Sequence, residues 1–396
     1  MIRRDSEDTI HTLLRGFPIV TITGPRQSGK TTLAKMVFSD KPYASLEDPD
    51  IRLAARDDPR SFLERYPDGA VLDEVQRCPE ILSYLQSLVD ADGRMGLYIL
   101  TGSQQFGLMS DIVQSQAGRT AFVELLTFSL NELTQANRLP GSIDLMLHTG
   151  SYPPLYDRDV SVRSWFNAYV TAYIERDVRQ VLKVQELETF QHFVRLCAGR
   201  TGQLLNYSAL AADCGITHNT AKAWLSVLEA GYIVFQLRPH HVNFNKRLIK
   251  ASKLYFYDVG LVSWLLGIQT PEQMETHPLR GSIFETFVVA EVMKFFFNRG
   301  ERPNLYFWRD SSGLEVDLLI ENAGRTIPVE IKSGKTIARD FFSSLEKWMS
   351  LAGERALDPT LIYGGKESYF HRGIQIHSWQ KVNFNFNLQG TKKAPL

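Results

Sequence analysis

The sequence predicts an α/β protein built from several parts, and three stretches carry that prediction. The β-branched run Val20–Thr23 ends in a glycine-rich loop that leads into a helical segment. The apolar strand Ala70–Leu72 ends in two carboxylates. Near the other end of the chain, Leu314–Ile320 and Thr326–Ser333 read as two strands of a hairpin that follows an apolar helix. Strands that alternate with helices build a parallel sheet whose ligand lies at the carboxyl ends of the strands.

Composition limits the class of protein without naming a partner. The 396 residues suggest two to three domains, and 44% hydrophobic with 22% charged residues is typical of a soluble globular protein. Lys+Arg and Asp+Glu both number 44, so any basic surface must be local. We expect a cytoplasmic protein with reduced thiols, no signal peptide and no membrane span, because the three cysteines form no C-x-x-C pair and no long uncharged apolar run occurs.

The first stretch fits the phosphate-binding motif G-x-x-x-x-G-K-[ST] in its strand–loop–helix context. Backbone N–H groups of such a loop and the N-terminus of the following helix attract phosphate. Lys30 is expected to reach the β- and γ-phosphates, and Thr31 to hold Mg²⁺. The residues expected to bind ATP are Gly24, Pro25, Arg26, Gln27, Ser28, Gly29, Lys30, Thr31 and Thr32.

The two carboxylates after the next buried strand predict hydrolysis of the bound nucleotide. Asp73 is expected to bind Mg²⁺ through water, and Glu74 to orient or deprotonate the attacking water. A strand end with two solvated acids is the alternative. A further strand ends near Ser103, which is our first choice for a polar group near the γ-phosphate. Thr101 is the second choice, and a plain turn the alternative.

These motifs together resemble a known group of ATPases. Gly24–Thr32, Leu72–Gln76 and Leu100–Ser103 resemble bacterial and archaeal AAA+ proteins with an AAA_14-type P-loop domain and a C-terminal DUF4143 domain. Ala117–Arg119, residues 124–133 and 173–178 also fit, so the resemblance covers nearly the whole chain. Gly150–Pro153 departs from it, because the family more often has two glycines before an aromatic-proline pair.

The resemblance implies an arginine that completes the active site, often from a neighbouring subunit, and therefore a ring of identical chains. Arg119 and Arg176 are the candidates, and a structural role is the alternative for each.

The middle of the chain predicts a helical lid followed by a winged helix. Two short helices meet at Gly215, and Tyr232–Leu237 and Leu254–Phe256 read as strands of the wing. The segment between these strands is basic and almost free of acidic residues. We expect DNA contacts from Asn219, Lys222, Lys246, Arg247 and Lys250, although winged helices also serve as protein-binding modules.

The last third carries a set of carboxylates and a lysine. Glu285 and Glu291 lie on an apolar helix, where a buried carboxylate needs a proton, a partner or a metal. Glu330 and Lys332, two residues apart on a strand, share a face. Glu285, Asp317 and Glu330-Ile331-Lys332 resemble the PD-(D/E)xK nucleases, and particularly archaeal Holliday-junction resolvases. The resemblance implies Mg²⁺ held by Glu285, Asp317 and Glu330, with Lys332 positioning water. Carboxylates on a surface hairpin are the alternative.

We therefore expect four parts: an AAA+ P-loop core (1–135), a helical lid (136–198), a winged helix (199–262) and a PD-(D/E)xK nuclease-like α/β domain (263–396). The expected function is ATP-driven remodelling, translocation or branch migration of branched, single-stranded or duplex DNA. The last domain is expected to bind or cut this DNA, and whether its nuclease-like site is active stays open. Two alternatives stay open. One is a nucleotide-gated switch with an inert last domain, and the other is a nuclease that acts in defence against mobile DNA.

Overall fold

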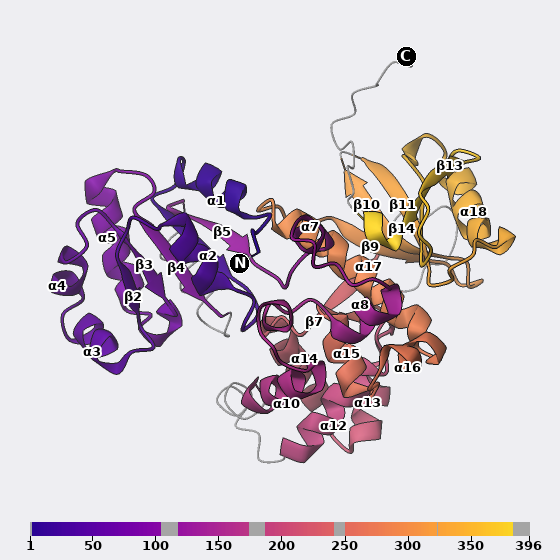
Figure 1. Ribbon diagram of the computed structural model, residues 1–396, viewed down its shortest axis with the longest axis horizontal. Coiled ribbons are helices and arrows are strands. Elements are labelled where there is room, and N and C mark those ends of the chain that lie inside the picture. Colours follow the sequence, from indigo (N-terminus) through magenta and orange to yellow (C-terminus); the bar gives the residue numbers. More distant parts are fainter. Residues whose placement is uncertain (1, 104–117, 174–186, 241–249, 323, 383–396) are drawn as a thin grey trace.

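The computed structural model describes residues 2–103, 118–173, 187–240, 250–322 and 324–382. Figure 1 shows a sheet with flanking helices formed by the N-terminal third, a second sheet formed by the C-terminal third, and helices of the middle of the chain beside both. The α/β fold class predicted from the sequence is confirmed.

The N-terminal sheet has five parallel strands in the order β2-β3-β4-β1-β5. This order places β1 between β4 and β5, so that the phosphate-binding loop follows a strand with neighbours on both sides. The strands are β1 (Ile19–Thr23), β2 (Tyr43–Ser45), β3 (Ala70–Asp73), β4 (Tyr98–Gly102) and β5 (Thr120–Glu124). The helices are α1 (Glu7–Leu14), α2 (Lys30–Val37), α3 (Pro49–Asp57), α4 (Pro59–Glu64) and α5 (Ile81–Asp92).

Helices cover both faces of this sheet because its strands are apolar on both sides. Val20 and Ile22 of β1 pack in one buried cluster with α1 and α2. Ile19, on the opposite face, packs in a second cluster with α3, α4 and α5. A parallel sheet buried on both faces is the usual outcome of strands without polar alternation.

The middle of the chain is helical and ends in a small antiparallel sheet. A buried aromatic group that includes Tyr152, Trp165 and Tyr169 packs the first of these helices together. The helices are α7 (Leu130–Gln135), α8 (Ile143–Thr149), α9 (Pro154–Asp157), α10 (Val162–Tyr173), α12 (Leu187–Ala198), α13 (Tyr207–Cys214) and α14 (His218–Ala230). The strands are β6 (Gln203–Leu204), β7 (Val234–Pro239) and β8 (Lys253–Phe256), followed by α15 (Val259–Leu265) and α16 (Pro271–Thr276).

The C-terminal third forms a mixed sheet with a helix on each face. Helix α17 (Arg280–Phe297) packs on one face, and α18 (Ser343–Ala352) packs on the other through Leu345 and Trp348. The strands are β9 (Leu305–Arg309), β10 (Glu315–Asn322), β11 (Arg325–Lys332), β12 (Thr360–Tyr363), β13 (Tyr369–His371) and β14 (Ile374–Ser378).

These strands continue without interruption into β7, β8 and β6, of which β7 and β8 are the strands predicted to form the wing. The full order is β13-β14-β12-β11-β10-β9-β7-β8-β6, a sheet of nine strands. β7 and β9 pair in parallel at Arg238 with Tyr306 and at Pro239 with Phe307. One sheet therefore spans residues that the sequence assigned to two domains.

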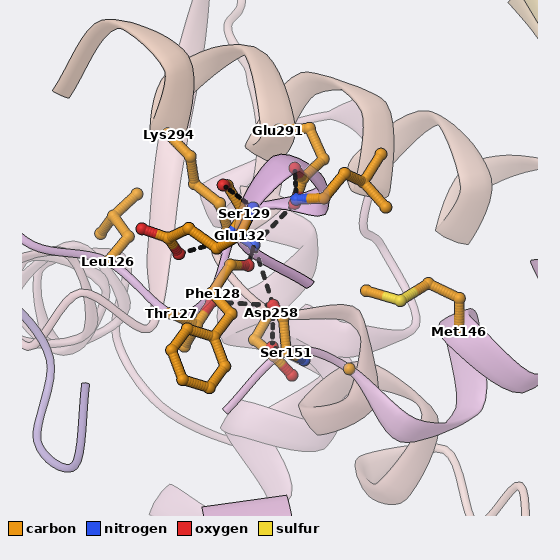
Figure 2. A network of polar contacts seen from close by, with 12 residues as sticks. Leu126, Thr127, Phe128, Ser129, Glu132, Met146, Ser151, Asp258, Glu291 and Lys294 are labelled. Carbon is orange, nitrogen blue, oxygen red and sulfur yellow. Dashed lines mark hydrogen bonds and ion pairs between the residues drawn. The ribbon is translucent and has the colours of Figure 1, made fainter. Parts of the chain in front are cut away.

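A buried polar network joins the two sheets through α17 (Figure 2). The Lys294 ammonium donates to Glu291 Oε1 at 2.7 Å, to the Phe128 carbonyl at 2.8 Å and to Ser151 Oγ at 2.8 Å. Glu291 also accepts the Leu130 N–H at 2.8 Å. The buried Glu291 thus has the partners that the sequence analysis required of it.

The network continues into α15. Asp258 accepts both the N–H and the hydroxyl of Ser151, at 2.8 and 3.0 Å, and accepts the Leu261 N–H as the N-cap of α15. Burial raises the pKa of Asp258, and the Lys294 charge opposes that rise. Residues from the segment after β5, the turn after α8, α15 and α17 therefore meet in one dry polar contact.

None of the helices in the described ranges is long and apolar enough to cross a bilayer.

Replacing Lys294 with Met should destabilise the protein strongly, because Glu291 would remain buried without its cation. Removing one partner of a buried pair costs about 3–5 kcal/mol of unfolding free energy. The measurement is chemical denaturation of the purified variant. The double variant Glu291→Gln/Lys294→Met should recover part of the loss, and Lys347→Met, which changes an exposed lysine of α18, should leave stability unchanged. A Lys294→Met protein as stable as the wild type would contradict the importance of this contact.

Candidate functional site

The phosphate-binding loop requires glycine at two positions for different reasons. Gly24 has φ of +144°, and a Cβ there would lie 2.1 Å from the Leu125 carbonyl oxygen. Gly29 has φ of +94° and is the residue before α2. The loop backbone is therefore held close to the segment after β5, and it ends at a helix N-terminus, where a phosphate is favoured.

Lys30 lies buried at the start of α2 and contacts the loop itself. Its ammonium donates to the carbonyls of Gly24 at 3.1 Å and Pro25 at 2.8 Å. Burial lowers the pKa of Lys30 to about 8, while Glu74 raises it. An anion beside the ammonium would favour its charged form, as a bound triphosphate does.

The Asp73 carboxylate, at the carboxyl end of β3, accepts hydrogen bonds from three hydroxyl groups. Thr31 Oγ1 lies 2.9 Å from one carboxylate oxygen and 3.1 Å from the other, and the Tyr43 hydroxyl donates at 2.8 Å. The Thr101 hydroxyl donates to the same carboxylate. A hydroxyl and a carboxylate held together beside a phosphate cradle are the oxygen ligands that Mg²⁺ uses in nucleotide sites, so these residues fit the expected ion.

Glu74 follows in a left-handed conformation, with φ of 56°. Gln76 Nε2 donates to the Glu74 carboxylate and also to Ser103 Oγ, the latter at 3.1 Å. Burial raises the pKa of Glu74, while Lys30 lowers it. The structure thus brings Lys30, Asp73, Glu74 and Ser103 together, with Thr101 closer than Ser103 to Asp73.

The loop faces a cleft of about 400 Å³ whose far wall comes from the middle helices. The sequence analysis predicted a helical lid over this segment but named none of the residues of this wall as part of the nucleotide site, although the Pro153-Pro154 pair signals a fixed turn. Arg158 lies in this wall and is exposed, and its side chain forms no ion pair or hydrogen bond within the described ranges. The lining comprises Arg26, Gln27, Gly29, Lys30, Thr31, Thr32, Glu74, Pro153, Pro154, Asp157, Arg158, Tyr169 and Ala172.

Arg4 supports the loop from behind and was also missed. Its buried guanidinium donates to the Ser28 carbonyl at 2.6 Å, to the Leu126 carbonyl at 2.7 Å and to Glu132 at 2.9 Å. The only sequence feature that distinguishes Arg4 is its place beside Arg3 near the N-terminus.

The arginine expected to complete the site lies far along the strands from the loop. Arg119 precedes β5, whose first residue, Thr120, is paired with Ile19 at the start of β1, whereas the loop follows Thr23. Its guanidinium forms an ion pair with Asp90 at 2.5 Å. Arg176, the other candidate, lies outside the described residues.

Helices α13 and α14 form the predicted helix–turn–helix, and one face of α14 is exposed to solvent. Ala221, Trp224, Leu225 and Leu228 are buried, while Asn219 and Lys222 are exposed. Lys250 is also exposed. The other two residues expected to contact DNA, Lys246 and Arg247, fall in a segment that the structure does not describe.

In the C-terminal sheet, three carboxylates approach one another. Oxygens of Glu285, Glu315 and Asp317 lie within 4.8 Å of each other. Glu315 was missed, although it stands two residues before Asp317 on the same strand. A register shift between Val316 and Leu319 interrupts the β9–β10 pairing there, and Asp317 accepts the Ile331 N–H at 2.8 Å.

Glu330 and Lys332 lie beside this group but pair with each other. Lys332 Nζ is 2.5 Å from Glu330 and 3.8 Å from Asp317. Burial raises the pKa of Glu330 to about 8 and that of Glu285 to about 7. Glu330 is not in the group within 4.8 Å, so the structure gathers Glu285 and Asp317 with Glu315 instead.

An ammonium group already lies among these carboxylates. Lys253, from β8 of the wing, contacts Glu285 at 2.8 Å and also contacts Glu315. Tyr255 donates to Glu285 at 2.5 Å. In this arrangement, the carboxylates do not offer Mg²⁺ a free set of oxygen ligands.

Comparisons with known proteins agree with the nucleotide site. Residues 16–134 match the family described as AAA domain, and residues 141–272 and 280–381 match two domains of unknown function, DUF8612 and DUF4143. An uncharacterized protein of Mycobacterium tuberculosis, Rv2008c, is 31% identical over 349 residues, which cover 87% of this chain and 77% of that protein. Mb2031c of Mycobacterium bovis matches to the same extent.

The chain belongs to the family of these mycobacterial proteins and is an ATPase of the AAA type.

Solved structures similar to the ATPase share little sequence with it. The Walker-type ATPase PABY2304 of Pyrococcus abyssi is 15% identical, covering 66% of this chain and 94% of that chain, with a TM-score of 0.45. AMPPCP-bound DnaA from Aquifex aeolicus is also 15% identical, covering 57% and 85%, with a TM-score of 0.31.

ATP binding should weaken as the pH rises above about 8, because burial lowers the pKa of Lys30 to that value and the neutral amine attracts phosphate poorly. The loss of affinity should approach about tenfold per pH unit if one proton is taken up on binding. The stability of the nucleotide-free protein depends on pH in the opposite direction. The folded chain holds fewer protons than the unfolded chain between about pH 8 and 10.5, so this group makes the protein more stable as pH rises through that window.

The measurement is calorimetric titration of a nonhydrolysable ATP analogue across this pH range. Lys30→Met should bind weakly and show a flat profile over the same range. A wild-type affinity that does not change between pH 7 and 9.5 would exclude titration of Lys30.

Proposed function

We propose that this ATPase acts on DNA, and that ATP hydrolysis drives remodelling, translocation or branch migration of branched or other non-B-form DNA. The observation that supports it is the exposed face of α14, where Asn219 and Lys222 project from the second helix of a helix–turn–helix. Such a helix contacts base edges and phosphates when it enters a groove. The C-terminal domain binds the same DNA, and whether it also cleaves DNA depends on its carboxylates.

Within the nucleotide site, each residue has a separate task. Lys30 binds the β- and γ-phosphates, and the loop backbone orients them. Glu74 removes a proton from the attacking water, and the bond from Gln76 fixes the carboxylate for that step. Thr31 and Asp73 would hold Mg²⁺, which supplies positive charge to the phosphates. Ser103 and Thr101 connect Glu74 and Asp73 to the end of β4.

The position of Arg119 supports an active site shared between subunits of a homo-oligomeric ring. Thr120, the residue after Arg119, pairs with the start of β1, so Arg119 lies away from its own loop. In a ring it would serve the loop of a neighbouring chain. Transition-state charge on the γ-phosphate would attract its guanidinium. Arg176 remains the other candidate.

Arg119→Ala should therefore reduce ATP turnover by about a thousandfold while ATP binding is retained. Mixing it with Lys30→Ala subunits should restore part of the turnover, because an intact loop then meets an intact Arg119. The assay is steady-state phosphate release from each protein and from the mixture. Asp90→Ala, which removes only the partner of Arg119, is the control. Unchanged turnover of Arg119→Ala would exclude this role.

DNA should stimulate ATP turnover, with a preference among duplex, single-stranded and four-way-junction DNA. Lys222→Glu should weaken binding and lower the salt slope of log K by about one unit, because one phosphate contact is lost. Arg15→Glu, a charge reversal of the exposed residue that follows α1, is the matched control. The measurement is DNA binding by fluorescence anisotropy over a range of salt concentrations, which gives the salt slope of each variant. Turnover indifferent to every DNA, with no DNA binding, would overturn the proposal.

A second candidate is a nucleotide-gated regulatory switch or a defence protein, whose last domain is an inert scaffold. The pairing of Lys253 with Glu285 and Glu315 favours it, because charges satisfied inside the chain need no metal. Strand cleavage in Mg²⁺ that Asp317→Asn abolishes would favour the DNA-cleaving function, whereas nucleotide-dependent binding of a protein without any effect of DNA would favour the switch.

A further inference from the structure

The carboxylate group of the C-terminal sheet contains a cation that belongs to a different part of the chain. Lys253 lies 32 residues before Glu285 in the sequence, and its side chain is only 4% exposed. Its ammonium touches Glu285 and Glu315, two of the three carboxylates whose oxygens converge. Sequence motifs of the last domain gave no indication of it, because the residue comes from the wing.

The backbone that carries Lys253 is fixed on both sides. β8 pairs with β6 at Leu204 and with β7 at Leu237, so Lys253 sits in an inner strand of the continuous sheet. Tyr255, on the same strand, adds its hydroxyl to Glu285. The ammonium is therefore placed by the fold and not by a mobile side chain at the surface.

The charges nearly balance without any added ion. Three carboxylates converge here, Glu285, Glu315 and Asp317, with Glu330 beside them, and three cations face these four groups. Lys253 contacts Glu285 and Glu315, Arg309 lies 3.0 Å from Glu315, and Lys332 contacts Glu330 and lies near Asp317. A divalent ion held by Glu285 and Glu315 would lie beside the Lys253 ammonium, which already contacts one oxygen of each carboxylate. Two like charges in a partly buried site repel each other.

We propose that Lys253 is the resident cation of this group: its ammonium occupies the place of the divalent metal, so that the C-terminal domain holds no metal while the wing is docked. The carboxylates then join the wing to the C-terminal sheet, and metal binding requires Lys253 to leave. This bears on the proposed DNA chemistry only through cleavage, since DNA binding by α14 does not depend on it.

The test compares Mn²⁺ binding in matched proteins without nucleotide, by the loss of the free-ion signal in electron paramagnetic resonance. Binding that disappears in Asp317→Asn is assigned to the carboxylate group, which separates it from the nucleotide site. We expect wild type and Asp317→Asn to give the same isotherm. Lys253→Met should gain a bound Mn²⁺ per chain, and Lys253→Met/Asp317→Asn should lose it. Lys250→Met, an exposed lysine just before β8, should behave as the wild type does.

Thermal stability provides a second readout. In EDTA, Lys253→Met should melt at a lower temperature than wild type, and Mn²⁺ should restore part of the difference. Mn²⁺ should shift the melting temperature of wild type by no more than it shifts that of Asp317→Asn. A metal site in wild type that depends on Asp317 would overturn the proposal, even if Lys253→Met does not fold. So would a folded Lys253→Met that gains no metal. Neither result depends on DNA, so the proposed function is tested separately.

Discussion

The fold depends on one buried ion pair, that of Glu291 with Lys294. A buried ion pair is stable only when its remaining hydrogen-bonding groups are also satisfied, and here they are satisfied by atoms from other parts of the chain. The Phe128 carbonyl and Leu130 N–H lie just after the nucleotide-binding sheet, and Ser151 comes immediately before the residues that wall the nucleotide cleft. The helix that carries the pair also carries Glu285. A single contact thus fixes the spacing between two chemically distinct regions.

The nucleotide site and the carboxylate group of the C-terminal sheet each contain a buried lysine, and they stabilise its charge in different ways. At the phosphate-binding loop, a buried lysine rests on neutral carbonyl groups, which leave its charge available for an anion. In the C-terminal sheet, a buried lysine contacts two carboxylates and is largely neutralised by them. The first site is therefore prepared for a ligand, and the second is largely complete within the chain.

The nucleotide site could be predicted from sequence because its residues are local. Gly24 to Thr32 form one continuous loop, and Asp73 and Glu74 follow one buried strand, so short-range patterns were sufficient. Arg4, Tyr43, Pro154 and Arg158 were missed because only tertiary packing brings them to the loop. The same limit applied in the last domain. The two-residue period of a strand placed Glu330 and Lys332 on one face. The same period links Glu315 to Asp317, and this local signal was overlooked. Lys253 reaches the group only through strand pairing, which leaves no local signal.

The continuous nine-stranded sheet also affects how such a protein can evolve. The match to DUF4143 starts at residue 280, yet the sheet of that domain pairs through β9 with β7, some forty residues earlier in the chain. A gene fragment that began at residue 280 would encode β9 with one bare edge, and bare edges pair with other chains. Recombination that preserves folding must therefore transfer the wing together with the C-terminal sheet. The segment that must be transferred together to keep the sheet paired therefore begins before residue 280, where the DUF4143 match starts.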